Sequence, residues 1–132
     1  MKTNIIRGGG VAHRKYARDF RKGFPRKMRK AALRSALLAK MLASDLMVLD
    51  GLAMTAPATK RMATVMKNLK VNRTCLLTLA DRDANIYLSC RNLPDLTVRI
   101  AAELNAFDVM TRRKMVVTRE AMKALVGQEA QS

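Results

Sequence analysis

The stretch CLLTLADRDANIYLSCRNLPDLTVRIA, residues 75–101, decides the fold. It holds two short apolar runs, residues 75–80 and 96–101, on either side of a helical segment, residues 81–93, that ends before Pro94. Short runs that are apolar throughout are typical of strands buried on both faces. A strand, a helix and a second strand in succession favour parallel pairing. We therefore expect two strands of a mainly parallel sheet here.

The same alternation continues on both sides of this stretch. Residues 46–50 and 115–118 predict two further strands, and residues 55–70, 105–112 and 120–126 predict helices. Thr55 and Asp81 stand where they could cap the helices that follow them. The fold class is therefore α/β, with a mostly parallel sheet of about four strands flanked by helices.

Residues 25–43, PRKMRKAALRSALLAKMLA, predict a helix with Pro25 in its first turn, where the missing N–H costs nothing. A helical wheel places its basic side chains in the first half and on one side. The expected apolar side consists of Met28, Ala31, Ala32, Leu38, Ala39 and Leu42. We expect residues 25–132 to form the globular domain and residues 1–24, which are rich in glycine and positive charge, to form an extended basic arm.

Charge is the most informative property of the composition. Lys and Arg number 26 against 10 Asp and Glu, which gives a net charge of +16 and a pI near 11. Residues 1–40 hold 13 of the basic side chains and a single acidic one, Asp19. Such a field attracts polyanions, so we expect the N-terminal third to meet a nucleic acid.

Several classes of site are excluded or disfavoured. With two cysteines and one histidine the chain offers neither a zinc cluster nor a C-x-x-C redox pair, so Cys75 and Cys90 are expected to be buried free thiols in a reducing compartment. No apolar run is long enough to cross a bilayer. Residues 1–30 are also Arg-rich and acid-poor, as organellar transit peptides are, and that alternative stays open.

Three rings, Tyr16, Phe20 and Phe24, stand at four-residue spacing among the cations. They could stack on unpaired bases, or they could form a stripe that anchors the arm on the domain. The glycines after Arg7 let the backbone approach an anion, or they form a flexible linker; they lack the preceding strand and the Lys-Ser/Thr ending of a nucleotide-binding loop. The residues expected to bind RNA are Arg7, Gly8, Gly9, Gly10, His13, Arg14, Lys15, Tyr16, Arg18, Arg21, Lys22, Arg26, Lys27, Arg29, Lys30 and Arg34.

An enzyme is the alternative from another class. Asp50, Asp81 and Asp83 follow predicted strands, where α/β enzymes place catalytic or metal-binding carboxylates. Helix capping explains these residues more simply, and His13 has no nucleophile beside it in the sequence. We expect no catalytic residue, no metal and no cofactor.

Several segments, in this order along the chain, resemble the large-subunit ribosomal protein L four family, over residues 7–126. They are Arg7-Gly8-Gly9-Gly10-Val11, Arg18-Asp19-Phe20, Arg26-Lys27-Met28-Arg29, Ala32-Leu33-Arg34-Ser35-Ala36-Leu37, Ala56-Pro57-Ala58-Thr59-Lys60, Asp83-Ala84-Asn85-Ile86-Tyr87-Leu88, Arg91-Asn92-Leu93-Pro94 and Leu104-Asn105-Ala106-Phe107-Asp108. The resemblance implies a Rossmann-like globule and a structural role in binding and organising large-subunit rRNA beside neighbouring ribosomal proteins. A regulatory RNA-binding protein outside the ribosome is the alternative.

Two departures from the family pattern are visible. Only Met1 to Ile6 stand before the glycines, where the family has an opening strand, a helix and the outgoing arm of a loop, and His13-Arg14-Lys15-Tyr16 replaces a proline-containing continuation. The expectation is a family member without the N-terminal part, with the loop tip absent or supplied by a separate chain. Such truncation favours a mitochondrial ribosome over a bacterial one.

Overall fold

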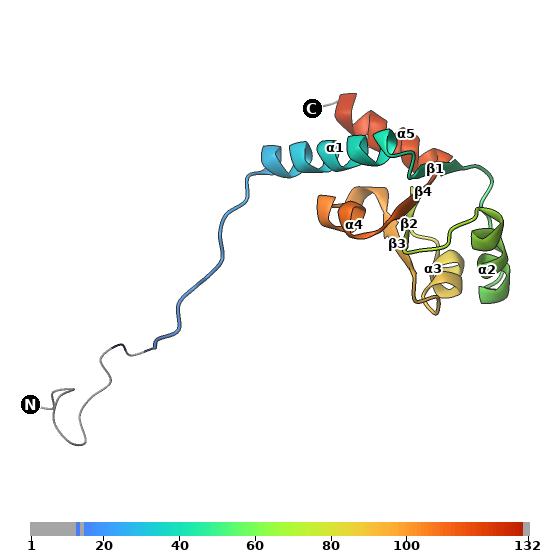
Figure 1. Cartoon of the computed structure of the whole chain (residues 1–132), viewed down its shortest axis with the longest axis horizontal. Coiled ribbons are helices and arrows are strands. Elements are labelled where there is room, and N and C mark those ends of the chain that lie inside the picture. Colours follow the sequence, from blue (N-terminus) through green and yellow to red (C-terminus); the bar gives the residue numbers. More distant parts are fainter. Residues whose placement is uncertain (1–12, 14, 131–132) are drawn as a thin grey trace, which may run out of the picture.

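A parallel sheet of four strands forms the centre of the computed structural model, which describes residue 13 and residues 15–130. The strands are β1 (Leu46–Leu49), β2 (Cys75–Leu79), β3 (Leu96–Ile100) and β4 (Lys114–Thr118). Their order across the sheet is β1-β4-β2-β3, and all three pairings are parallel (Figure 1). The prediction of an α/β fold with a mostly parallel sheet of about four strands is confirmed.

The last strand along the chain, β4, lies in the interior of the sheet. Val116 is in register with Met47 of β1 on one side and with Leu77 of β2 on the other. All five residues of β2 are buried, as are Met115 to Val117 of β4. Their apolar side chains fit this position, because helices cover both faces of the sheet.

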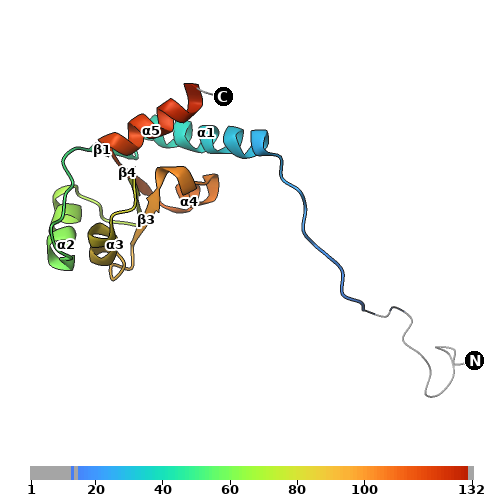
Figure 2. The same cartoon turned by 180° about the vertical axis from the view of Figure 1, so that it is seen from behind.

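The helices form one layer on each face of the sheet (Figures 1 and 2). On one face α2 (Thr59–Asn68) and α3 (Ala84–Cys90) pack against Leu77 and Val116. On the other, α1 (Arg26–Leu42), α4 (Ala106–Thr111) and α5 (Arg119–Ala130) pack against Leu76 and Val117, and a short 3-10 helix, η1 (Ala101–Glu103), follows β3. The alternation of strand side chains between two cores makes the fold a three-layer sandwich.

The buried side of α1 differs from the predicted one. Leu33, Ala36 and Leu37 pack on the sheet, and Ala36 is the buried one among them. Met28, Leu38 and Leu42 of the expected apolar side are exposed. The reason is that α1 has apolar residues on most of its circumference, and the face that meets α4 and α5 is the one that carries Leu33, Ala36 and Leu37.

Two predicted helix caps are wrong. α2 begins only at Thr59, and its N-cap residue Ala58 makes no side-chain capping bond, so Thr55 caps nothing. Pro57 disfavours helical geometry at the residue before it, and the Ala58 N–H donates to Ser89 Oγ at 2.9 Å. α3 is capped by Asp83 and not by Asp81: its carboxylate accepts from the N–H groups of Asn85 (2.8 Å) and Ile86 (3.2 Å).

Among the residues that the structure describes, one buried side-chain oxygen has no hydrogen-bond partner. Thr78 of β2 is fully buried, and its Oγ1 makes no hydrogen bond. A buried hydroxyl without a partner loses its hydrogen bonds to water and gains nothing in return, at a cost of about 1–3 kcal/mol.

In the part of the chain that the structure describes, no helix combines the length and apolar character needed to span a bilayer.

The Asp83 cap generates a stability prediction. Asp83→Ala is expected to lower the free energy of unfolding by about 1 kcal/mol, since two N–H groups at the start of α3 lose their acceptor. Asp81→Ala, which removes the same charge two residues earlier, is the matched control and is expected to have a smaller effect. Urea denaturation of both variants measures the difference, and equal losses would contradict the assignment of the cap.

The Thr78 hydroxyl generates a second prediction, of opposite sign. Thr78→Val keeps the branched shape and removes the unpartnered oxygen, so it is expected to raise the free energy of unfolding by about 1 kcal/mol. Thr64→Val on α2 is the control, because that hydroxyl is exposed and already donates to the Lys60 carbonyl at 3.0 Å. A Thr78→Val protein that melts at a lower temperature than the parent would show that the hydroxyl is solvated or bonded.

Candidate nucleic-acid interface

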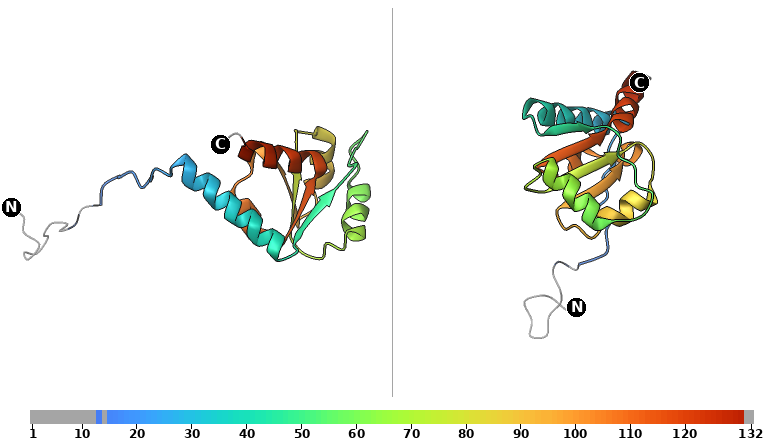
Figure 3. Two further views of the ribbon diagram at one scale, coloured as in Figure 1. Left: turned by 90° about the horizontal axis from the view of Figure 1, so that it is seen from above. Right: turned by 90° about the vertical axis from the view of Figure 1, so that its right-hand side faces the viewer.

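The first half of α1 is a cationic surface attached to the domain. Residues 26–31 are all exposed, and this part of the helix extends beyond the sheet (Figure 3). Its basic side chains are Arg26, Lys27, Arg29, Lys30 and Arg34, all of them exposed. The first turn contains no acidic residue, and no side chain caps it. The unpaired N–H groups and the positive end of the helix dipole therefore add to the attraction for anions.

The second half of α1 fixes this surface to the core. Lys40 Nζ donates to the carbonyl oxygens of Arg112 (2.6 Å) and Arg113 (2.8 Å), just before β4. Leu33 and Leu37 pack on the same layer as Val109 of α4 and Leu125 of α5. The helix thus begins in a cationic surface and packs in the core through its middle, at Leu33, Ala36 and Leu37. The expectation that it ends in the core is wrong, because Met41 and Leu42 at its end are exposed.

The described part of the arm continues the cationic surface. Residues 15–25 form neither helix nor strand, and every one of them is exposed. They include Lys15, Arg18, Arg21 and Lys22 of the predicted RNA-binding set, and His13 is exposed as well. The predicted residues Arg7, Gly8, Gly9, Gly10 and Arg14 lie outside the described residues.

The three rings of the arm are placed differently from one another. Tyr16 and Phe20 are 79% and 75% exposed, so neither anchors the arm on the domain. The Arg18 guanidinium carbon lies 4.6 Å from the centre of the Phe20 ring, a cation–π contact. Phe24 is half exposed, and its carbonyl accepts from Arg29 Nε (3.2 Å) and Nη2 (3.1 Å). Only Phe24 therefore meets the globular domain.

The acidic residues of the alternative enzyme site do lie together. Asp50, Asp81 and Asp83 line a hollow of about 380 Å³ at the carboxyl ends of the strands. Asp50 is paired with Arg119, whose Nη1 lies 2.9 Å from Asp50 Oδ2, and Asp83 caps α3. Among the residues described, no group of three or more acidic, histidine or cysteine side chains is arranged to hold a metal ion. Capping and ion pairing account for two of the three carboxylates.

Both cysteines are buried free thiols, as predicted. Burial raises the pKa of Cys75 to about 11, and burial together with the neighbouring Cys75 raises the pKa of Cys90 to about 11. Nucleophilic attack and metal binding require the thiolate, so at neutral pH these side chains contribute packing and not chemistry.

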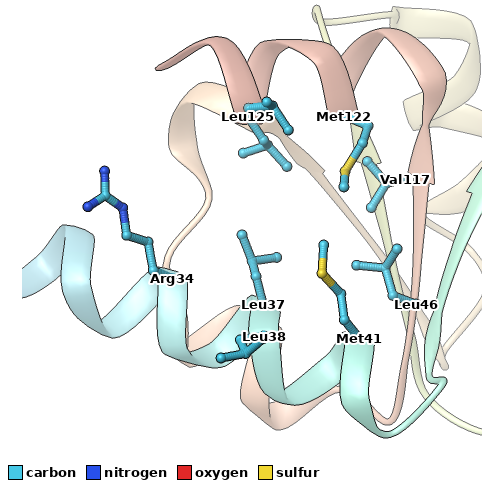
Figure 4. Close-up of a pocket in the computed structure, with 9 residues that line it drawn as sticks. Arg34, Leu37, Leu38, Met41, Leu46, Val117, Met122 and Leu125 are labelled. Carbon is cyan, nitrogen blue, oxygen red and sulfur yellow. The ribbon is translucent and has the colours of Figure 1, made fainter. Parts of the chain in front are cut away.

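An apolar groove of about 300 Å³ lies between α1 and α5. Leu37 and Met41 of α1 point toward Met122 and Leu125 of α5 across it, and Arg34 lies at one end (Figure 4). Apart from Arg34 the lining side chains have no charge, so the groove offers no group for acid–base or metal chemistry.

Sequence reasoning missed one exposed ring beside the cationic surface. Phe107 of α4 is 74% exposed and lines a hollow that Phe24, Arg29 and Lys30 also line. Asn105 could have predicted the position of this ring, because its side chain caps α4 by accepting from the Asp108 N–H at 2.7 Å. A capped helix start places the residue two positions after the cap in the first turn, where it can face solvent.

Comparison with known proteins agrees with this arrangement. Residues 1–128 match the Ribosomal protein L4/L1 family. The chain is 39% identical over 122 residues to "Large ribosomal subunit protein uL4" of Symbiobacterium thermophilum and 40% identical over 122 residues to the protein of the same name from Pelotomaculum thermopropionicum, which covers 92% of this chain and 59% of each relative. The uL4 protein of Acetivibrio thermocellus is 40% identical over 115 residues, which are 86% of this chain and 55% of that relative.

The chain spans about 59% of the length of the first two relatives. The family match covers both the cationic surface and the sheet, and the predicted resemblance is confirmed. This chain belongs to the Ribosomal protein L4/L1 family.

Proposed function

We propose that this chain is a structural component of the large ribosomal subunit that binds and organises large-subunit rRNA. The observation that supports it most is the uncapped, exposed and basic first half of α1, continued by the basic chain before it. The relatives are named as large-subunit ribosomal proteins, which agrees with an RNA partner of this class.

The mechanism is charge neutralisation by a positioned surface. In this proposal residues 1–24 act as an arm and residues 25–132 as the globule that carries it. The cations neutralise rRNA phosphates and release counterions, while the globule fixes their position relative to neighbouring ribosomal proteins. Most such contacts position the RNA, and few read its bases. No catalytic step and no cofactor form part of the proposal.

The location in this proposal is the ribosome. The relatives compared above are bacterial, and they give no support to the sequence-based preference for a mitochondrial ribosome. They likewise give none to a separate chain that supplies the N-terminal part of the family. The proposal therefore includes neither a compartment of its own nor such a chain.

Ultraviolet crosslinking in the native cells tests the partner. We expect large-subunit rRNA to be attached to peptides from residues 7–34, because the cations and rings of the proposed interface lie there. Sequencing of the attached RNA identifies it, and mass spectrometry locates the peptide. Messenger RNA in place of rRNA would favour a regulatory protein, and the absence of attached RNA would overturn the proposal.

Neutralising the start of α1 tests the surface. The variant carrying Arg26→Gln, Lys27→Gln, Arg29→Gln and Lys30→Gln is expected to lose most of its affinity for large-subunit rRNA. With about six to ten phosphates engaged, the parent should bind roughly a thousandfold or more weaker at 200 mM salt than at 50 mM. The variant should respond less steeply, by about one unit of the log–log slope for each phosphate contact removed.

The matched control removes the same charge elsewhere. Lys60→Gln, Arg61→Gln, Lys67→Gln and Lys70→Gln change four exposed cations in and just after α2, on the opposite face of the sheet. This control should keep nearly the parental affinity and salt slope. Equal losses in both variants would mean that net charge alone, and not the α1 surface, attracts the RNA, and circular dichroism melts establish that both remain folded.

A further inference from the structure

A hollow of about 560 Å³ opens beside the cationic surface, between the start of α1 and the segment from η1 to α4. Phe24, Arg29, Lys30 and Leu33 line one side, and residues 101–107 line the other. Ala101 and Leu104 are buried, so the lining includes part of the folded core. Its volume lies in the range of sites that receive small ligands.

Two exposed rings belong to this hollow and come from segments far apart in the sequence. Phe24 is 50% exposed and Phe107 is 74% exposed. Full burial of a phenylalanine side chain provides about 1.5–3 kcal/mol, of which Phe107 forgoes the larger part and the half-exposed Phe24 roughly half. Their exposure around one hollow therefore indicates a surface that is covered in a complex.

Hydrogen bonds fix the backbone segments that carry the two rings. The Phe24 carbonyl accepts two hydrogen bonds from the Arg29 guanidinium, at 3.2 and 3.1 Å. Phe107 stands in the first turn of α4, which Asn105 caps. Asp108 in the same turn accepts from Arg99 Nε of β3 at 2.9 Å, which ties the turn to the sheet. The hollow is thus formed before any ligand arrives.

The charge around the hollow decides the class of its ligand. Arg29 and Lys30 belong both to the lining and to the surface proposed to contact phosphates. The exposed Glu103 adds one negative charge to the same lining, so the three charged side chains together leave the hollow with a net positive charge. The Arg29 guanidinium has five N–H donors, and the Phe24 carbonyl occupies only two of its nitrogens. Aromatic faces next to phosphate-binding cations are the combination by which proteins hold unpaired nucleotides. An apolar peptide side chain could fill the hollow but would make no use of these cations.

We propose that this hollow receives an unpaired base of the bound RNA, which stacks on Phe107 and Phe24 while Arg29 and Lys30 contact the adjoining phosphates. The inference rests on the proposed function and adds a base-binding site to it. Only a bulged or looped nucleotide can stack on these rings, because a base in a helix is already paired and stacked. Stacking therefore adds affinity for unpaired nucleotides alone. The site would thereby direct the protein to a particular place on a folded RNA, which charge alone does not do.

Alanine substitution measures the contribution of the ring. Phe107→Ala is expected to weaken binding to a transcript of large-subunit rRNA by roughly ten- to a hundredfold, the range for loss of one stacked base. Its salt slope should stay parental, because no cation is removed. Tyr87→Ala on α3 is the matched control, since Tyr87 is a 47% exposed ring in the other helical layer, and it should bind as the parent does.

A fluorescent reporter tests stacking directly. The chain contains no tryptophan, so Phe107→Trp introduces a single indole at the hollow and Tyr87→Trp a single one elsewhere. A single-stranded adenosine hexanucleotide is expected to quench the first and not the second. A phosphodiester of the same length without bases should quench neither, because it offers charge but nothing to stack.

The outcomes separate this inference from the function on which it rests. Failure of the parent protein to bind rRNA in a salt-dependent way would overturn the proposed function. Normal rRNA binding by Phe107→Ala, or equal quenching by the oligonucleotides with and without bases, would overturn the base site alone. An indole at position 107 that responds to other large-subunit ribosomal proteins but not to RNA would assign the hollow to a protein contact and overturn it too.

Discussion

The hydrogen-bonded ladder between β4 and its two neighbours is the constraint on which the rest of the structure depends. Residues 114–118 pair with β1 on one side and with β2 on the other, so they join the N-terminal and central parts of the chain into one sheet. The same strand places Met115 and Val117 in one core and Val116 in the other. A charge or proline here would therefore disturb both helical layers together.

The position of α1 follows from that sheet. Its buried residues need the core that β4 completes, and Lys40 reaches the two carbonyls immediately before β4. Because the core contacts of α1 begin at Leu33, residues 26–31 stay exposed together with their cations. A rigid helix thus transmits the position of the core to the cationic surface. The globular domain therefore determines where the cations lie, and the cations determine that the surface attracts anions.

The sequence pattern predicted the strands, but it did not predict the residues that cap the helices or the exposure of single side chains. The four strands could be predicted because β2 and β4 are apolar runs with few alternatives. Thr55 does not cap α2, because that helix begins only at Thr59, where the Ala58 N–H donates to Ser89 Oγ. Asp81 does not cap α3, because Asp83, two residues later, accepts from the first N–H groups of that helix. The exposed ring of Phe107 was not predicted because only the fold brings it to the hollow that Phe24 also lines.

The place of β4 also has a consequence for the order in which the protein is made. A chain synthesised from its N-terminus releases the arm and α1 first, then β1, β2 and β3, and only later the strand that belongs between β1 and β2. Until that strand arrives, β1 and β2 each carry an open edge that β4 later covers, and such edges are sites of faulty pairing with other chains. The cationic segment is already available during this interval, so its charge can keep nascent copies of the chain apart before the globule closes.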